Sequence, residues 1–86
     1  MISTFPETYQ LSSRIILRQI GRQHIAIVKL IKSRIIQKDA VKIVTMARQI
    51  QSVSPSLQVS LICTKNICSK SLALLADEQV EVIYEE

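Results

Sequence analysis

The chain has 86 residues, of which 48% are hydrophobic and only one is glycine, and its formal net charge is +4. This composition predicts a single folded domain with a small core, for which assembly into an oligomer would bury further apolar surface. No apolar run approaches the roughly 20 residues that cross a bilayer. The first ten residues also lack the basic start and apolar core of a signal peptide.

The two cysteines, Cys63 and Cys68, do not form a Cys-x-x-Cys pair. A reduced, cytoplasmic protein without a membrane segment is therefore expected.

Charge is unevenly distributed along the chain. Residues 1–50 contain nine Lys or Arg and two Asp or Glu, whereas residues 51–86 contain two Lys and five acids. Three interpretations remain open: a basic face for phosphate groups, head-to-tail pairing of acidic and basic halves in neighbouring subunits, or a solvated basic surface without a partner.

Residues 1–10 are interpreted as a polar N-terminal lead-in, in which Pro6 is expected to block regular structure. Residues 11–86 are interpreted as a single α/β domain.

The stretch SRIILRQIGRQHIAIVKLIK, residues 13–32, predicts two strands joined by a turn that Gly21 supplies. A short helix that begins at Ser12 or Ser13 and ends at Gly21 is the alternative. The β-branched isoleucines before Gly21 favour the strand. Residues 24–31 are almost continuously apolar, which is typical of a central strand.

Residues 37–53, QKDAVKIVTMARQIQSV, give the clearest helical pattern in the chain. One face of this predicted helix carries apolar residues at helical spacing, namely Ala40, Ile43, Val44, Ala47 and Ile50. The Ser-Pro-Ser sequence at 54–56 is expected to end the helix.

The last third of the chain predicts a strand, a helix and a strand. Residues 57–64 alternate Leu, Val, Leu and Cys with other side chains, as strands do. Residues 69–79 form a helix for which Ser69 is the expected N-terminal cap, and residues 80–86 alternate apolar and acidic side chains. The order β-β-α-β-α-β predicts an α/β fold with a small mixed sheet and helices packed on it.

This order resembles the core of the PD-(D/E)xK restriction-endonuclease-like family. The sequence LIKSR at residues 30–34 stands where that family has Glu-x-Lys followed by small or basic residues at a strand end. The sequence LICTKNICSKSLALLADEQVEVI at residues 61–83 is similar to the closing strand–helix–strand unit of the family. The resemblance covers about residues 12–84 and implies a minimal nuclease-like core.

Lys32 takes the position of the motif lysine, whereas Leu30 stands where the family has its metal-binding Glu. The position of the metal-binding Asp falls near Ser13 or Arg14. Because Mg²⁺ requires hard oxygen ligands and this hydrolysis requires the ion, the resemblance implies a member without catalytic residues, metal or cofactor. An active nuclease that uses Asp39 as a migrated carboxylate is the less favoured alternative.

Other chemistry-bearing residues give weaker signals. His24, the only histidine, follows a turn and is interpreted as a strand-edge side chain, with a catalytic role as the alternative. Cys63 is expected in the core, and Cys68 lies near a helix N-terminus that can lower the pKa of its thiol. Together with His24 these cysteines are one ligand short of a structural zinc site.

A single glycine excludes a glycine-rich phosphate loop. The remaining candidate phosphate-binding residues are six basic side chains: Arg14, Arg18, Arg22, Lys29, Lys32 and Arg34. With three aromatic residues in the chain, stacking on single strands is disfavoured and duplex backbone is the expected nucleic-acid target.

Two functional hypotheses follow. The first is a non-catalytic nuclease-like module that acts by association, binding DNA backbone or a partner protein. The second is a small structural or regulatory homo-oligomer, most simply a homodimer, with no nucleic-acid role. No small-molecule substrate is evident in either.

Overall fold

The computed structural model describes residues 3–85 and confirms the expected order β-β-α-β-α-β. A short 3-10 helix, η1 (Pro6–Tyr9), precedes β1 (Ile16–Gly21), β2 (His24–Lys29), α1 (Gln37–Val53), β3 (Gln58–Cys63), α2 (Ser69–Asp77) and β4 (Glu81–Tyr84). Residues 1 and 2 of the expected lead-in and residue 86 of the expected last strand lie outside the described residues. No helix in residues 3–85 is both long and apolar enough to cross a membrane.

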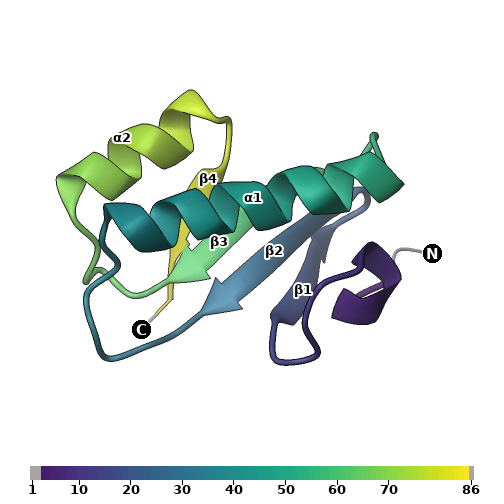
Figure 1. The fold of residues 1–86 in the computed structure, drawn as a ribbon, viewed down its shortest axis with the longest axis horizontal. Coiled ribbons are helices and arrows are strands. Elements are labelled where there is room, and N and C mark those ends of the chain that lie inside the picture. The colour runs from purple at the N-terminus through teal and green to yellow at the C-terminus, as the bar shows by residue number, and fades with distance from the viewer. Residues whose placement is uncertain (1–2, 86) are drawn as a thin grey trace.

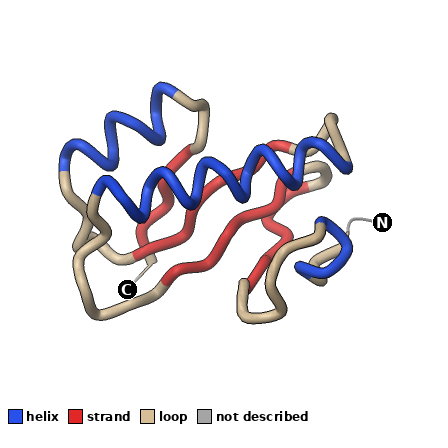
Figure 2. Tube along the Cα trace, in the orientation of Figure 1, coloured by secondary structure: helices blue, strands red, loops and turns tan. Residues whose placement is uncertain are grey.

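The sheet is mixed and follows the chain order β1-β2-β3-β4. Strand β1 pairs with β2 in an antiparallel hairpin, whereas β2, β3 and β4 are parallel to one another. The two crossover helices follow strands that are added in one direction, so crossovers of the same hand place both on one face of the sheet. Figures 1 and 2 show α1 and α2 together on that face.

The β1–β2 hairpin turns at Arg22 and Gln23 rather than at Gly21, which is the last residue of β1. Gly21 pairs directly with His24 and does not have a positive φ angle. A Cβ atom added at Gly21 would lie 3.0 Å from the His24 Cβ. The hairpin therefore uses glycine for close approach between strands and not for a left-handed turn.

Helix α1 has the bounds that its periodicity predicts, and its predicted apolar face is confirmed. Ala40, Ile43, Ala47 and Ile50 are fully buried, and Val44 is partly buried against them. The preceding residue, Ile36, has no side chain able to cap the helix, but the Asp39 carboxylate accepts a hydrogen bond from the Ile36 N–H at 3.2 Å. The first backbone N–H groups of α1 therefore remain without a side-chain cap.

Helix α2 begins one residue after its cap, which is Cys68 and not the expected Ser69. The Cys68 Sγ accepts a hydrogen bond from the backbone N–H of Ser71 at 3.4 Å. Sulfur takes the position that Ser, Thr, Asp or Asn usually occupies, which is why residue preferences did not indicate it. Helix α2 ends at Asp77, two residues earlier than expected, and Gln79 adopts a positive φ angle before β4.

The lead-in is part of the packed domain. The expectation that Pro6 blocks regular structure is wrong, because Pro6 is the first residue of η1, where its missing N–H costs nothing. Tyr9 is 2% exposed within the core, and its hydroxyl donates to the Ser3 carbonyl at 2.7 Å. This segment shields part of β1 that the two long helices do not reach (Figure 1).

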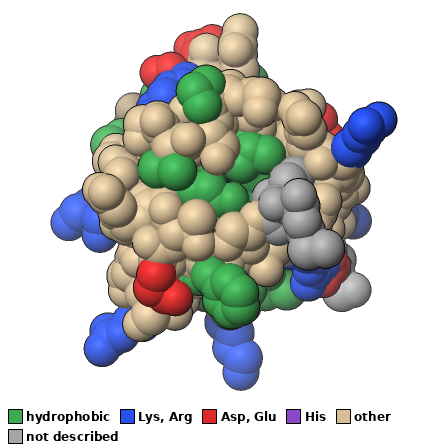
Figure 3. All heavy atoms as spheres, turned by 90° about the vertical axis from the view of Figure 1, so that its right-hand side faces the viewer, with side chains coloured by type: hydrophobic (Ala, Val, Ile, Leu, Met, Phe, Trp, Pro, Cys, Tyr) green, Lys and Arg blue, Asp and Glu red, His purple; other side chains and the backbone are tan. Residues whose placement is uncertain are grey.

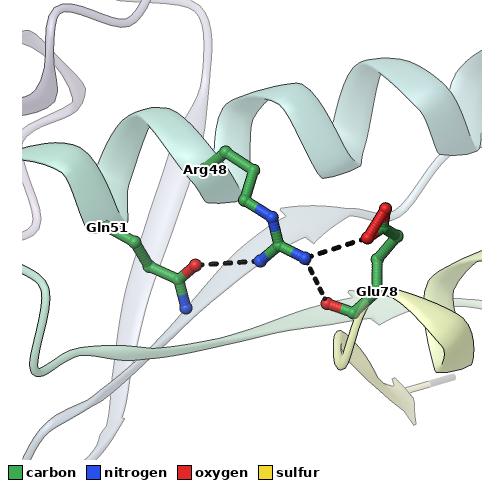
Figure 4. A network of polar contacts seen from close by, with 3 residues as sticks. All are labelled: Arg48, Gln51 and Glu78. Atoms are coloured by element: carbon green, nitrogen blue, oxygen red, sulfur yellow. Dashed lines mark hydrogen bonds and ion pairs between the residues drawn. The ribbon is translucent and has the colours of Figure 1, made fainter.

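Arg48 joins α1 to the end of α2 (Figure 4). Its Nη2 donates to the Glu78 carbonyl at 2.8 Å and to the Glu78 Oε2 at 3.1 Å, and its Nη1 donates to the Gln51 Oε1 at 2.9 Å. Glu78 is the C-terminal cap of α2, so the guanidinium stabilises the negative end of that helix. Arg48 therefore has a structural role.

Candidate phosphate-binding edge

The carboxyl ends of β2, β3 and β4 meet at one edge of the sheet, together with the N-termini of α1 and α2. The loops that leave β2 and β3 are joined there by an isolated bridge between Ile35 and Ile67. The Ile35 N–H donates to the Asn66 carbonyl at 2.9 Å, and the Asn66 Nδ2 donates to the Lys32 carbonyl at 3.1 Å. In parallel α/β sheets this is the edge where ligands bind.

Four of the six predicted phosphate-binding residues lie at this edge. Lys29 is the last residue of β2 and pairs with Cys63. Lys32 and Arg34 are exposed in the loop that follows. Arg14 precedes β1, which is antiparallel to β2, so it reaches the same edge and lines a hollow together with Lys29.

The other two predicted residues lie elsewhere. Arg18 is in the middle of β1, where its Nη1 is 2.6 Å from the Glu85 Oε2. Hydrogen bonding to Glu85 raises the pKa of the Arg18 guanidinium. Arg22 lies in the β1–β2 turn, at the opposite end of the sheet. The structure therefore does not bring Arg14, Arg18 and Arg22 together along the hairpin.

Three lysines that were not predicted complete the edge. Lys38 and Lys70 are each the second residue of a helix, and Lys65 lies in the loop after β3. The predicted strand–helix order contained this signal, because a helix that follows a parallel strand begins at the carboxyl edge. We call the following set the basic edge: Arg14, Lys29, Lys32, Arg34, Lys38, Lys65 and Lys70.

The two described carboxylates nearest the basic edge have partners of their own. Glu85, directly after β4, pairs with Arg18, and Asp39, in the first turn of α1, accepts from the Ile36 N–H. Asp39 is thus occupied in stabilising the start of α1. Seven cations facing two paired carboxylates make this edge electropositive.

Cys68 lies in this electropositive surrounding. The Ser71 hydroxyl, 2.9 Å from the Cys68 Sγ, contributes most to lowering the pKa of the thiol, and the Ser71 N–H contributes further. The positive charge of Arg34 makes a smaller contribution in the same direction. Cys63 is buried in the core as expected, and burial raises the pKa of its thiol.

The opposite end of the molecule differs in character. A hollow of about 690 Å³ lies there, lined mainly by uncharged polar residues of the lead-in, the β1–β2 turn and the α1–β3 loop, with Arg22 as its one charged residue. Figure 3 views this end and shows basic side chains standing apart around its rim, with apolar groups between them. The cations here do not form a continuous surface.

The positions that the nuclease resemblance assigns fall close to the basic edge. Strand β2 ends at Lys29, so Lys32 lies three residues beyond the strand end and Leu30 is an exposed loop residue. Counting back two residues from Lys29 reaches Ile27, which is buried in the core and carries no carboxylate. Within residues 3–85 no group of three His, Cys, Asp or Glu side chains is arranged to hold a metal ion.

His24 lies at the start of β2, and its Nε2 is 2.5 Å from the Ser60 Oγ. A serine paired with a histidine is the arrangement of a nucleophile and its base. However, Ser60 is 0% exposed, so no substrate carbonyl or phosphorus can reach its Oγ. The pair therefore satisfies two polar groups on neighbouring strands.

No protein-family model matches this chain, and neither the curated proteins nor the solved structures include a significantly similar one. The argument for function therefore rests on the chain's own residues.

Proposed function

We propose that this chain is a non-catalytic, nuclease-like module that acts by association, binding the phosphate backbone of duplex DNA through the basic edge. The observation that carries the proposal is the gathering of seven cationic side chains, from five separate segments, at one edge of the sheet. Backbone phosphates are the abundant ligand for such a surface, and each contact is made by a point charge without base readout.

The helix termini support an anionic ligand at this edge. Both α1 and α2 present their N-termini there, and the first turn of α1 lacks a side-chain cap. Backbone N–H groups at a helix N-terminus and the positive end of the helix dipole favour an anion. The lysines in the first turns, Lys38 and Lys70, oppose the dipole of their own helices, which is a cost that a bound phosphate would relieve.

Duplex DNA is a better candidate than single strands for this surface. Tyr9 is buried, whereas Phe5 and Tyr84 are exposed on segments far apart in the chain. Single-strand platforms require neighbouring aromatic side chains on which successive bases stack. A non-catalytic role agrees with the burial of Ser60 and with the use of Asp39 in capping α1.

The test is fluorescence anisotropy of a labelled DNA duplex titrated with wild-type protein and two matched variants. Arg34→Glu reverses one exposed arginine at the basic edge, and Arg22→Glu reverses one exposed arginine at the opposite end. Because both variants change the net charge equally, a difference between them reports the location of binding. We expect Arg34→Glu to weaken binding roughly tenfold and Arg22→Glu to change it less than about twofold.

An acidic protein surface is the second candidate for the same cations. Poly-glutamate added as a competitor distinguishes the two, because it carries charge without the spacing of duplex phosphates. Displacement of the duplex by an equal concentration of glutamate charges would favour a protein partner over DNA. Absence of binding at low salt, where charges are least screened, would remove nucleic acid from the account.

A further inference from the structure

The face of the sheet opposite α1 and α2 is covered by no helix of the described chain (Figure 1). We call this the open face. The pairing register identifies its side chains, because residues that share a face alternate along each strand. Val59, Leu61 and Cys63 belong to the core beneath the helices, so Ser60 and Ile62 point to the open face.

An aliphatic row crosses all four strands of the open face. The register aligns Ile16 of β1 with Val28, Ile62 and Ile83 of the following strands. Ile16 is 62% exposed, Val28 and Ile83 are half-buried, and Ile62 is buried at the centre. A continuous aliphatic row on the face of a sheet that faces water indicates a surface that another layer covers.

The two sides of this row carry opposite charges. Arg18 lies on β1, whereas Glu81 and Glu85 lie on or directly after β4, the other edge strand. Arg18 aligns with Ala26 of β2 and Ser60 of β3, so its ion pair with Glu85 spans the two central strands. Both side chains of this pair are nearly half exposed, at 46% and 43%, and are accessible to a partner.

We propose that the open face is covered by the open face of a second copy of this chain. A two-fold axis parallel to the strands places β1 of one copy over β4 of the other, because rotation about that axis reverses the strand order. Arg18 then meets Glu85 of the second copy, and the same contact occurs twice. The surface is therefore complementary to itself, which favours a second copy over an unrelated partner.

The exchange of ion pairs makes this association favourable. Each intrachain Arg18–Glu85 pair is replaced by an interchain pair of the same chemistry, so the number of ion pairs is unchanged. The net gain is the burial of two aliphatic rows between sheets that pack about 10 Å apart. Burial of apolar area stabilises by about 25 cal/mol per Å² before the cost of association is subtracted.

The same axis has a consequence for the basic edge. Rotation about an axis parallel to the strands keeps the carboxyl ends of β2, β3 and β4 at the same end in both copies. The dimer would therefore present two basic edges side by side and double the cationic surface offered to a duplex. The dimer itself rests on the open face alone and does not depend on DNA binding.

The first test measures mass by sedimentation velocity over a range of concentrations. Wild type is expected to sediment as a species of twice the 9.7 kDa chain mass. Ile16→Asp places a charge in the aliphatic row and should raise the dissociation constant more than about tenfold. Val41→Asp changes an exposed valine, 52% accessible on α1, and should leave the dimer unchanged. Circular dichroism verifies that both variants are folded.

The second test separates an interchain pair from the intrachain one. Arg18→Glu alone and Glu85→Arg alone place like charges opposite each other in a homodimer, so each should weaken dimerisation about tenfold. An equimolar mixture of the two variants forms heterodimers in which residue 18 of each copy faces an opposite charge at residue 85 of the other. We expect the mixture to recover the wild-type dissociation constant.

Two results would overturn the proposal. A wild-type chain that remains monomeric at millimolar concentration has no self-association through any face. A dimer that is unaffected by Ile16→Asp, or a mixture that is no tighter than its components, excludes the open face in this orientation. Neither result bears on DNA binding, which the anisotropy titration measures separately.

Discussion

At the scale of single residues, the two cysteines occupy opposite surroundings. Cys63 is 0% exposed in the core, and burial raises the pKa of its thiol. Cys68 is half-buried at the start of α2, and hydrogen bonds from Ser71 lower the pKa of its thiol. Because the thiolate is the nucleophile, the two residues should differ in reactivity far more than their side-chain chemistry suggests.

We therefore predict selective alkylation of Cys68 by iodoacetamide. At neutral pH its rate should exceed that of Cys63 at least tenfold, and the midpoint of its rate–pH profile should lie below the ordinary thiol value. Ser71→Ala removes the hydroxyl that lowers this pKa most, so the midpoint should move to higher pH. Mass spectrometry of the alkylated peptides measures both rates, and equal rates for the two cysteines would contradict the assignment.

The sign of the linked stability effect follows from the same shift. Because the pKa of Cys68 is lower in the folded state, the unfolded chain binds more protons between the two pKa values, and the stability contribution grows as pH rises. That contribution is complete above the unfolded pKa and is lost as pH falls through the folded one. Ser71→Ala should flatten this dependence.

At the scale of elements, Arg48 connects α1 to the C-terminal end of α2 (Figure 4). We predict that Arg48→Ala lowers the free energy of unfolding by about 0.5–1 kcal/mol, since it removes a cation from the negative end of a helix at a partly exposed site. Lys42→Ala on the same helix, for which the structure shows no side-chain pair, is the control. Equal losses in urea denaturation would show that the contact contributes nothing of its own.

The lead-in provides a second test at this scale. Tyr9 is buried in the core, whereas Phe5, four residues earlier, is 70% exposed. Tyr9→Ala should cost about 3–5 kcal/mol of unfolding free energy because it leaves a cavity, and Phe5→Ala should change stability by less than about 0.5 kcal/mol. A small effect of Tyr9→Ala would mean that residues 3–10 are an independent appendage.

Periodicity predicted the elements well where burial alternates regularly. The bounds of α1 follow from its apolar face, and the β1–β2 hairpin follows from β-branched residues around Gly21. The N-terminal segment was harder to predict, because burial of Tyr9 depends on tertiary packing that its polar neighbours do not reveal. The cap of α2 was missed because cysteine is rarely a cap.

At the scale of the whole molecule, topology decides which charges meet. The sequence contains the six predicted basic residues, but spacing along the chain could not separate Arg22 from Lys32 and Arg34. The parallel arrangement of β2, β3 and β4 places the last two at one edge with Lys38 and Lys70. Element order alone would have identified those two lysines, whereas the diversion of Arg18 to Glu85 requires the three-dimensional structure.

The open face and the basic edge belong to different sides of the same domain. The first contains an aliphatic row between opposite charges, and the second contains cations at the strand ends. A dimer formed through the open face leaves both basic edges exposed at one end. Association with itself and association with a polyanion are therefore compatible in one small domain.

The measurement that tests the central claim most directly is the salt dependence of duplex binding by wild-type protein. Each phosphate contact releases a condensed counterion, so contacts from about four cations predict a slope of roughly −3 to −4 in a plot of log affinity against log salt concentration. Arg34→Glu should reduce this slope by about one, and Arg22→Glu should leave it unchanged. A slope near zero, or an equal reduction by both variants, would contradict phosphate binding at the basic edge.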